Sequence, residues 1–480
     1  MNRAVGFIVA AALIGVACGD NVGPPPLTSS QLLDKLRALP GVTASEVGTV
    51  AGPELQDFTY YVIHFTQPVD HDDPSQGYFQ QKVSLLHLNN VAPTPMIVHT
   101  SGYADDAGQY PTELAMMLNA NQVSIEHRYF GTSKPVPTDW SFLTIKQMAK
   151  DEQAIIIALK TVYEGAFVTT GASKGGMTAV FHRSFYSSEL ANQVAGTVAY
   201  VAPISFNAPD PRYQRQLDKI GNDDCRNALR ALASRMLVRA AQMQSFAEEE
   251  ASPATKDGPV YSRVAIGAAV EASIAQLEWS FWQGYGEAEC ANLPKPTASD
   301  TELYDFLTKI SPVAKFGDEC VGYYEAYTYQ TYSQLGFPMA TASSLTQDLT
   351  YQPSDYLGEL PTAPPEYSKH WMLDIDSNVE ANVDQLVFVY GEWDPWYGGA
   401  FATGRYAYKY TVDHGNHLVT LADLPSYQRD AALAQVARWT GVTPVVSRLR
   451  RAGSRTARAV PLAETMERRL LPPVFTAAPR

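Results

Sequence analysis

Six residues around position 173 constrain the fold more than any other segment of this chain. A short apolar run at 167–170 leads into Gly171-Ala172-Ser173-Lys174-Gly175-Gly176, and the residues that follow favour a helix. This pattern predicts a strand, a sharp turn and a helix, with glycines where the backbone must approach closely. A serine at such a turn is lifted clear of the backbone and can stand beside a base. We take Ser173 as a candidate nucleophile, although the same short pattern also occurs by chance in glycine-rich loops.

Two later segments supply the acid and the base that a serine nucleophile needs. A buried-strand pattern at 386–390 runs into Asp394, and a final strand pattern ends shortly before His417. The order serine, acid, histidine, each after a strand, is that of the α/β-hydrolase fold. His417 would take the proton of Ser173 as general base, and Asp394 would fix its tautomer. The alternative is that Asp394 only caps a turn and the histidine is a loop residue.

A second histidine, His414, lies close to His417 in the chain and is the alternative base. We favour His417 because it follows Gly415 by two residues, at the start of a segment that can turn back toward Ser173. His414 is then expected to end the final strand, which is predicted at 406–412.

Backbone N–H groups near Ser173 are expected to bind the oxyanion that forms during acyl transfer. One donor would be the amide of Lys174, directly after the serine. The second would come from the loop after a predicted strand at 95–100, where Gly102 permits close approach, and we assign it to Gly102 and Tyr103. An ordinary turn at the end of a strand is the alternative reading of this loop.

The N-terminus is typical of an exported protein. The apolar stretch within residues 1–17 follows one positive charge and is too short to span a membrane, so a signal peptide is expected there. Cys18 follows directly, which suggests a lipid anchor on its thiol, whereas Gly15 departs from the usual large aliphatic residue and leaves plain secretion open. Residues 18–45 are expected to be a tether.

Cysteine spacing and charge exclude several classes of function. Cys225, Cys290 and Cys320 allow one disulfide and one thiol, and their pairing cannot be read from the sequence. Zinc-binding spacings are absent, so we expect no metal and no other cofactor. The acidic cluster at 70–73 is expected to be a solvated turn rather than a metal site. A net charge of -14 argues against nucleic acid and anionic membranes as partners.

The length of 480 residues exceeds one plain hydrolase core, so an insertion is expected. Core strands are predicted within 46–205 and 381–442, and the intervening 206–380 has mostly helical periodicity. The predicted fold class is therefore α/β: an α/β-hydrolase core with a mostly helical cap inserted between strands, over the triad. Such caps exclude water and select substrates. Residues 443–480 are basic and are expected to form a solvated tail.

Several long motifs occur in order between about residues 61 and 424, which makes them far more specific than the turn around Ser173 alone. The motifs are Glu126-His127-Arg128-Tyr129-Phe130-Gly131, Asp139-Trp140, Leu143-Thr144, the run from Gly171 to Ala179, Val198-Ala199-Tyr200-Val201-Ala202-Pro203, Asp224-Cys225-Arg226, Tyr329-Gln330 and Leu335-Gly336. Together they closely resemble the PS-10 peptidase family, the S37 serine peptidases.

The resemblance implies an exopeptidase that acts on peptides and releases tri- or tetrapeptides after proline from a free N-terminus. It implies that Ser173 is the nucleophile, Asp394 the acid and His417 the base. The related prolyl carboxypeptidases and dipeptidyl peptidases are the nearest alternative, and Lys174 after the serine favours the S37 family. An esterase on the same fold and, from another class, a non-catalytic lipoprotein that binds peptides are the remaining alternatives.

Substrate binding suggests further candidates. An aminopeptidase needs a carboxylate for the substrate's ammonium group, and we assign Glu325 to it. A proline pocket needs flat aromatic walls, for which Trp393, Trp396 and Tyr397 are placed, although core packing explains aromatic residues equally well. The segment 126–128, Glu-His-Arg, is expected to form a buried ion-pair network that braces the oxyanion loop.

Overall fold

The structure is a computed structural model. It describes residues 28–49, 58–88, 94–105, 108–187, 193–253, 255, 258–339, 345–358, 360 and 362–451. The predicted signal peptide, the lipidation site Cys18 and residues 452–480 of the predicted tail lie outside these ranges. Among the described residues, the helices are all too short or too polar to cross a membrane.

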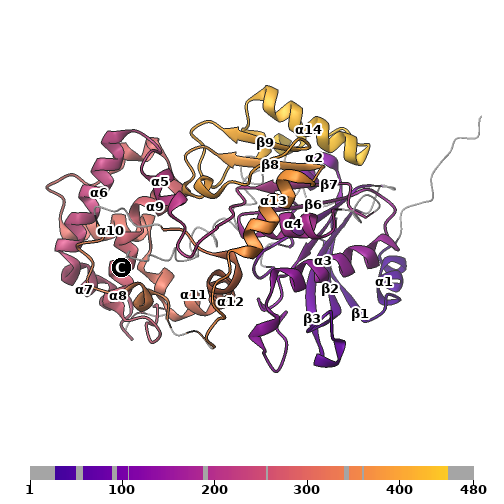
Figure 1. The fold of residues 1–480 in the computed structure, drawn as a ribbon, viewed down its shortest axis with the longest axis horizontal. Helices are drawn as coiled ribbons and strands as arrows, with labels where there is room; N and C mark the ends of the chain where they lie inside the picture. Colours follow the sequence, from indigo (N-terminus) through magenta and orange to yellow (C-terminus); the bar gives the residue numbers. More distant parts are fainter. Residues whose placement is uncertain are drawn as a thin grey trace, which may run out of the picture.

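A nine-stranded sheet forms the centre of the molecule, in the order β1-β2-β3-β5-β4-β6-β7-β8-β9 (Figure 1). The first three strands pair antiparallel, β3 also pairs antiparallel with β5, and every pair from β5 to β9 is parallel. Because parallel strands end at one edge of a sheet, the loops after β4, β6, β8 and β9 meet there. The strands are β1 (Val42–Thr49), β2 (Phe58–Pro68), β3 (Tyr78–Leu88), β4 (Met96–Thr100), β5 (Asn121–Ile125), β6 (Phe167–Ala172), β7 (Gly196–Tyr200), β8 (Leu386–Gly391) and β9 (Ala407–Val412).

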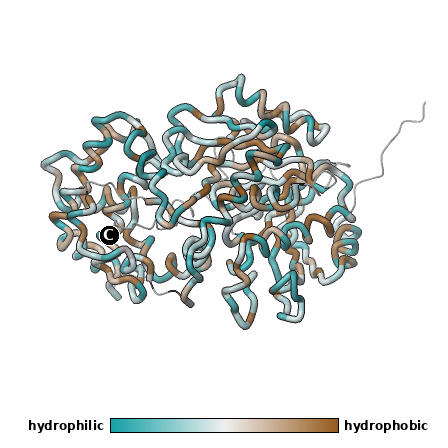
Figure 2. The backbone as a smooth tube through the Cα atoms, viewed as in Figure 1, coloured by the Kyte–Doolittle hydropathy of each residue, from teal (hydrophilic) through white to brown (hydrophobic). Residues whose placement is uncertain are grey.

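Helices cover both faces of the sheet. In β8, Val387 and Val389 pack toward α2 and α14, whereas Leu386 and Phe388 pack toward α4 and α13, as the alternation of a strand requires. Figure 2 shows hydrophobic residues along the central strands. The helices of the core are α1 (Ser29–Arg37), α2 (Glu113–Leu118), α3 (Ile145–Lys160), α4 (Lys174–Phe185), α13 (His370–Ala381), α14 (Ser426–Thr440) and α15 (Ser447–Arg451).

The inserted lobe is mostly helical, as predicted, and lies beside the sheet (Figure 1). It has a hydrophobic core of its own, which includes Trp279 and Trp282. Cys225 and Cys290 form a disulfide inside this lobe, and Cys320 is a buried free thiol. Its helices are α5 (Pro211–Leu217), α6 (Asp223–Val238), α7 (Ala240–Glu250), α8 (Ile266–Ala275), α9 (Leu277–Gly284), α10 (Asp300–Ile310), α11 (Asp318–Tyr323) and α12 (Glu325–Gln330).

Both ends of the described chain pack on the core, so two of the predicted domain boundaries, at the tether and at the tail, are wrong. Residues 28–45, predicted as tether, contribute α1 and part of β1, because Thr28 caps an amphipathic helix whose Leu32 and Leu36 are fully buried. At the other end, the N–H of Val445 bonds to the carbonyl of Met117 at 2.9 Å and Leu449 is buried, so the first part of the predicted tail packs on α2.

Helix α13 also moves a boundary, because it lies within the range predicted as cap but packs on the core. Its buried residues Met372, Ile375 and Val379 share a hydrophobic cluster with Phe181 of α4. Helix α13 therefore belongs to the core, and α12 contacts both lobes, because its Tyr327 and Tyr329 lie in the same cluster.

Candidate active site

The turn between β6 and α4 places Ser173 at the carboxyl edge of the sheet. Ser173 has φ 53° and ψ −124°, directly before α4, and its N–H donates to the carbonyl of Tyr200 at 2.9 Å. A Cβ on Gly171 would lie 2.5 Å from the carbonyl carbon of Gly175, and a Cβ on Gly175 would lie 2.3 Å from the oxygen of Thr100. The two glycines are therefore required for this strained turn to fold.

Asp394 and His417 meet at the ends of β8 and β9. His417 Nδ1 lies 2.6 Å from Asp394 Oδ2, and both side chains are buried. The other carboxylate oxygen, Oδ1, accepts the N–H of Trp396 at 3.0 Å, which fixes the carboxylate. Within the described part of the chain, His417 Nε2 has no hydrogen-bond partner, and Ser173 and His417 line the same cavity. The structure thus brings the three predicted residues together.

His414 lies apart from this pair. Its exposed ring stacks on Trp393, with 3.9 Å between ring centroids, and its Nε2 lies 3.6 Å from Asp413 Oδ1. Between the two candidate histidines, only His417 contacts Asp394.

The cap holds the loops that carry these two residues. The N–H of His417 donates to the carbonyl of Gln283 in α9 at 3.1 Å. From α5, the amide of Gln216 donates to the carbonyl of Glu392 at 2.8 Å, and it reaches that of Asp394 at 3.4 Å. The positions of the acid and the histidine therefore depend on the cap as well as on the sheet.

The loop after β4 lies against the first turn of α4. Gly102 has φ 75°, and a Cβ there would lie only 2.4 Å from the backbone nitrogen of Gly175. The carbonyl of Tyr103 accepts bonds from the hydroxyl of Ser101 at 2.7 Å and from the N–H of His127 at 3.0 Å. Gly102 and Tyr103 are thus held beside the backbone of Lys174, whose amide is the other predicted oxyanion donor.

The segment Glu126-His127-Arg128 braces this loop, but through hydrogen bonds more than through ion pairs. Glu126 accepts the N–H groups of Asp105 at 3.0 Å and Ser133 at 3.0 Å. The guanidinium of Arg128 pairs instead with Asp151, at 2.6 and 2.8 Å. Only Arg128 therefore forms the buried ion pair that the sequence suggested, while Glu126 satisfies backbone donors.

Aromatic side chains surround Ser173 on the side of the cap. Its cavity is lined by residues of both lobes: Tyr103, Lys174, Met177, Pro203, Gln283, Tyr324, Tyr327, Trp396 and His417. Trp396 was among the sequence candidates, whereas Trp393 packs on Trp282 and Tyr397 on Tyr390, away from the lining. Sequence reasoning missed Tyr324 and Tyr327, and the aromatic-rich run at 323–337 was the available signal.

Glu325, the predicted anchor for a substrate ammonium group, faces a cation of the protein. Its carboxylate lies 2.7 Å from the guanidinium of Arg263, and it is not among the residues that line the cavity of Ser173. The structure therefore does not bring Glu325 to Ser173.

A second cavity also includes Ser173 in its lining. Its lining includes Ser173, His417, Leu418, Val419 and the buried acid Glu113. Burial raises the pKa of Glu113 to about 7, against the effect of the bond from the N–H of Leu421 to its carboxylate.

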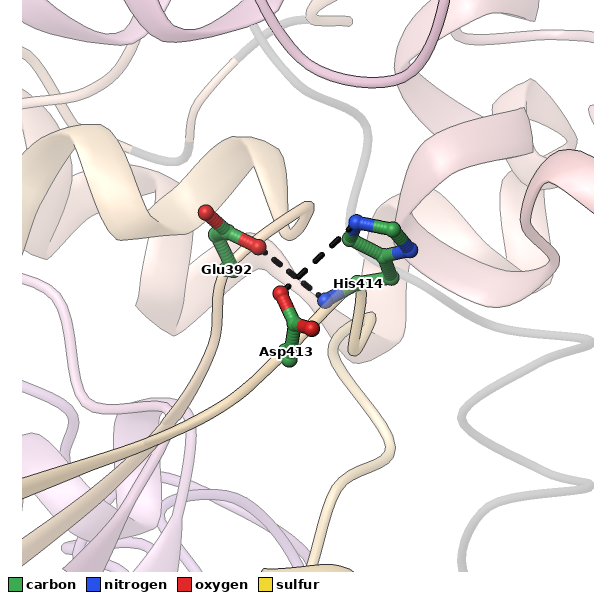
Figure 3. Close-up of side chains that lie close together, drawn as sticks. All are labelled: Glu392, Asp413 and His414. Carbon is green, nitrogen blue, oxygen red and sulfur yellow. Dashed lines mark hydrogen bonds and ion pairs between the residues drawn. The ribbon is translucent and has the colours of Figure 1, made fainter.

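One group of three possible metal ligands exists among the described residues: Glu392, Asp413 and His414 (Figure 3). It joins the loops after β8 and β9, but two of its three members are exposed, and the carboxylate of Glu392 already accepts the N–H of His414 at 3.1 Å. The predicted turn at 70–73 is held by contacts with α3, including that between His71 Nε2 and Asp151 Oδ1 at 2.7 Å, and by local bonds such as that from Ser75 N–H to Asp73. Neither group has the closed set of ligands that marks a structural metal site.

The fold and the site together define a class of protein. A mostly parallel sheet with a serine at the turn after β6, an acid after β8 and a histidine after β9 is that of an α/β-hydrolase. Within this class, the family model of PS-10 peptidase S37 matches residues 28–470. The chain belongs to this family and is a serine peptidase.

Similarity to individual proteins points the same way. The chain is 34% identical over 460 residues to the prolyl tri/tetrapeptidyl aminopeptidase of Streptomyces mobaraensis, covering 92% of this chain and 93% of that protein. Among solved structures, a proline iminopeptidase of Mycobacterium smegmatis is 13% identical with a TM-score of 0.38, covering 78% of this chain and 98% of the other. The assignment of the fold rests on the strand order and the serine turn rather than on that distant likeness.

Proposed function

We propose that this serine peptidase is an exopeptidase that releases tri- and tetrapeptides after proline from free N-termini. The observation that carries the proposal is the buried Asp394–His417 pair beside Ser173, in a chain that is 34% identical to a prolyl tri/tetrapeptidyl aminopeptidase. Peptides are then its partners and substrates, and no metal or organic cofactor takes part.

In this proposal Ser173 attacks the carbonyl carbon of the scissile bond. His417 Nε2 removes the hydroxyl proton, and Asp394, bonded to Nδ1, fixes the tautomer and stabilises the imidazolium. The tetrahedral oxyanion is bound by backbone N–H groups of Lys174 and of the loop at Gly102 and Tyr103. The imidazolium then gives its proton to the leaving amine, and water hydrolyses the acyl-enzyme by the same steps in reverse.

The two cavities that Ser173 lines support an assignment of subsites. The cap-side cavity contains the backbone of Lys174 and flat rings from Tyr103, Tyr324 and Trp396, which suit a proline next to the carbonyl in the oxyanion hole. The other cavity lies along His417 and the residues after it. His417, which protonates the leaving amine, lines both cavities, so we place the leaving peptide in the one that the proline does not occupy.

Recognition of the free N-terminus and export complete the proposal. We keep Glu325 as the proposed anchor for the substrate's ammonium group. Its ion pair with Arg263 would have to break before the substrate could bind there. Export, with or without a lipid on Cys18, is supported by the disulfide between Cys225 and Cys290, because disulfides persist in oxidising compartments.

The test uses purified full-length protein and fluorogenic Ala-Ala-Pro substrates whose N-terminus is either free or acetylated. We expect cleavage of the free form only, and a loss of about 10⁴-fold or more in kcat for Ser173→Ala. Asp394→Asn should lower kcat by a similar factor, because the histidine then takes the wrong tautomer. Asp413→Asn, an exposed neighbour of the site, is the matched control and should keep activity.

Other outcomes would reassign the enzyme. Equal cleavage of both forms would remove the requirement for a free N-terminus. Turnover of short acyl esters without cleavage of either peptide would replace the peptidase by an esterase on the same fold.

A further inference from the structure

The side chain of Lys174 is buried beneath the loop that follows β4. Only 3% of the residue is exposed, and its Nζ donates to the carbonyl oxygen of Gly102 at 2.5 Å. The same Nζ lies over the ring of Tyr103, 5.3 Å from the centroid, and over that of Phe130 at 5.0 Å. Aromatic faces favour a cation, so this cradle suits an ammonium group whose remaining protons have few other acceptors.

The bond to Gly102 fixes the direction of a neighbouring donor. In a trans peptide the carbonyl and the following N–H point to opposite sides, so the carbonyl of Gly102 sets where the N–H of Tyr103 points. Nζ, at the end of the buried Lys174 side chain, holds that carbonyl. The N–H of Tyr103 is thereby directed away from Nζ, and Tyr103 itself lines the cavity of Ser173.

We propose that Lys174 is a positioning residue that assembles both halves of the oxyanion hole. Its own backbone N–H is one donor, and its side chain orients the Gly102–Tyr103 peptide that supplies the other. The inference rests on the proposed acyl-transfer function. It assigns to the lysine after the serine a role that the sequence left open.

A buried acid supports this arrangement. Glu152 in α3 is fully buried, and both of its carboxylate oxygens have no hydrogen-bond partner among the described residues. Burial raises the pKa of Glu152 well above its usual value and lowers that of Lys174 well below its own, and the attraction between the two groups opposes both shifts. Glu152 thus interacts with Lys174 electrostatically without competing for the bond to Gly102, and that bond needs only an N–H of Nζ, whichever charge the amine carries.

The decisive experiment compares Lys174→Met with wild type. Methionine fills the same space without a donor. We expect kcat to fall by about 10²-fold to 10³-fold, as when an oxyanion donor is lost, with KM changed less than about threefold. Affinity for the tetrahedral adduct of Ala-Ala-boroproline should fall by a similar factor, whereas affinity for the product Ala-Ala-Pro should not.

Lys315→Met is the matched control, because Lys315 is also buried but lies in the cap, where its Nζ bonds to Ser280 at 3.3 Å. It should leave the ratio of boronate to product affinity unchanged. A Lys174→Met enzyme with kcat within about threefold of wild type, or with equal losses for boronate and product, would overturn the proposal.

If Lys174→Met does not fold, Phe130→Leu removes one ring of the cradle while keeping the lysine. It should weaken boronate binding more than product binding, and equal weakening would again refute the role. Hydrolysis of p-nitrophenyl acetate is measured in parallel, because it needs the same oxyanion hole. A wild type that cleaves the ester but no peptide would refute the proposed function, while the ester rates would still test Lys174.

Discussion

Gly102 lies against the backbone of Gly175 so closely that no side chain fits between them. Alanine at this position would push the loop after β4 away from α4, because its Cβ would approach the nitrogen of Gly175 to 2.4 Å at an unfavourable φ of 75°. We predict that Gly102→Ala lowers kcat on the fluorogenic peptide by about 10²-fold or more, with a much smaller change in KM.

Gly77→Ala separates this steric effect from backbone strain. Gly77 also has a positive φ, 102°, but its Cβ would have open space around it. The variant should lose some stability and keep its kcat. If both variants reduce kcat equally, the contact at Gly102 does not shape the oxyanion hole.

Contacts within the site could be predicted from the sequence only where the order of the strands along the chain determines which residues meet. Asp394 and His417 each follow a strand, so the order of parallel strands was enough to predict that they meet. The pairing of Glu325 with Arg263 depends on how two cap segments pack, and no local pattern records it. The bond from Lys174 to Gly102 could not be predicted for the same reason, because it joins residues far apart in the chain.

At the scale of elements, α2 is tied to the loop that carries His417. Glu113 begins α2, and its carboxylate accepts the N–H of Leu421 at 2.8 Å. The pKa of this buried acid is raised to about 7 from 4.5. The connection between α2 and the loop therefore carries a pH dependence.

We predict that Glu113 makes the protein less stable as the pH rises. Below pH 4.5 the acid is protonated in both states. Between pH 4.5 and about 7 the unfolded chain loses the proton first, so the free energy of unfolding falls. The loss is on the order of 3 kcal/mol, at 1.36 kcal/mol for each pKa unit.

Chemical denaturation of wild type and Glu113→Gln at pH 5 and pH 8 measures this effect. The difference in stability between the two proteins should shift in favour of Glu113→Gln at pH 8, since the amide does not titrate. Parallel behaviour of both proteins across this range would contradict the raised pKa.

Elements with a strong local pattern were predicted and those stabilised by distant packing were not. The apolar runs of β6, β7 and β8 mark buried strands without further information. Strand β1 is mostly exposed at the sheet edge, and residues 42–45 of it fall within the predicted tether. Helix α13 was assigned to the cap, because its sequence does not reveal that it packs on α4.

At the scale of the whole molecule, most of the cap packs around one hydrophobic cluster, which also takes in Trp396 of the core, and the disulfide between Cys225 and Cys290 lies entirely in the cap. We predict that Cys225→Ala/Cys290→Ala destabilises the cap by about 2–5 kcal/mol, as is common when a disulfide is lost. Tryptophan fluorescence during denaturation reports on it, because Trp279 and Trp282 lie in the cap core.

Reductant provides the control for this prediction. It should shift the unfolding of wild type and of Cys320→Ala in the same way, and leave the double variant unchanged. Unfolding of wild type that is insensitive to reductant would show that the bridge does not stabilise the cap.

The hydrogen bond from the N–H of His417 to the carbonyl of Gln283 makes the position of the catalytic base depend on the position of the cap. A cap that swings away to admit a chain would take with it one of the anchors of the base, and the serine would lose its proton acceptor. Substrate entry and reactivity then exclude each other. Such an enzyme would not cleave chains that bind while the cap is open, and would cleave only those chains over which the cap can close.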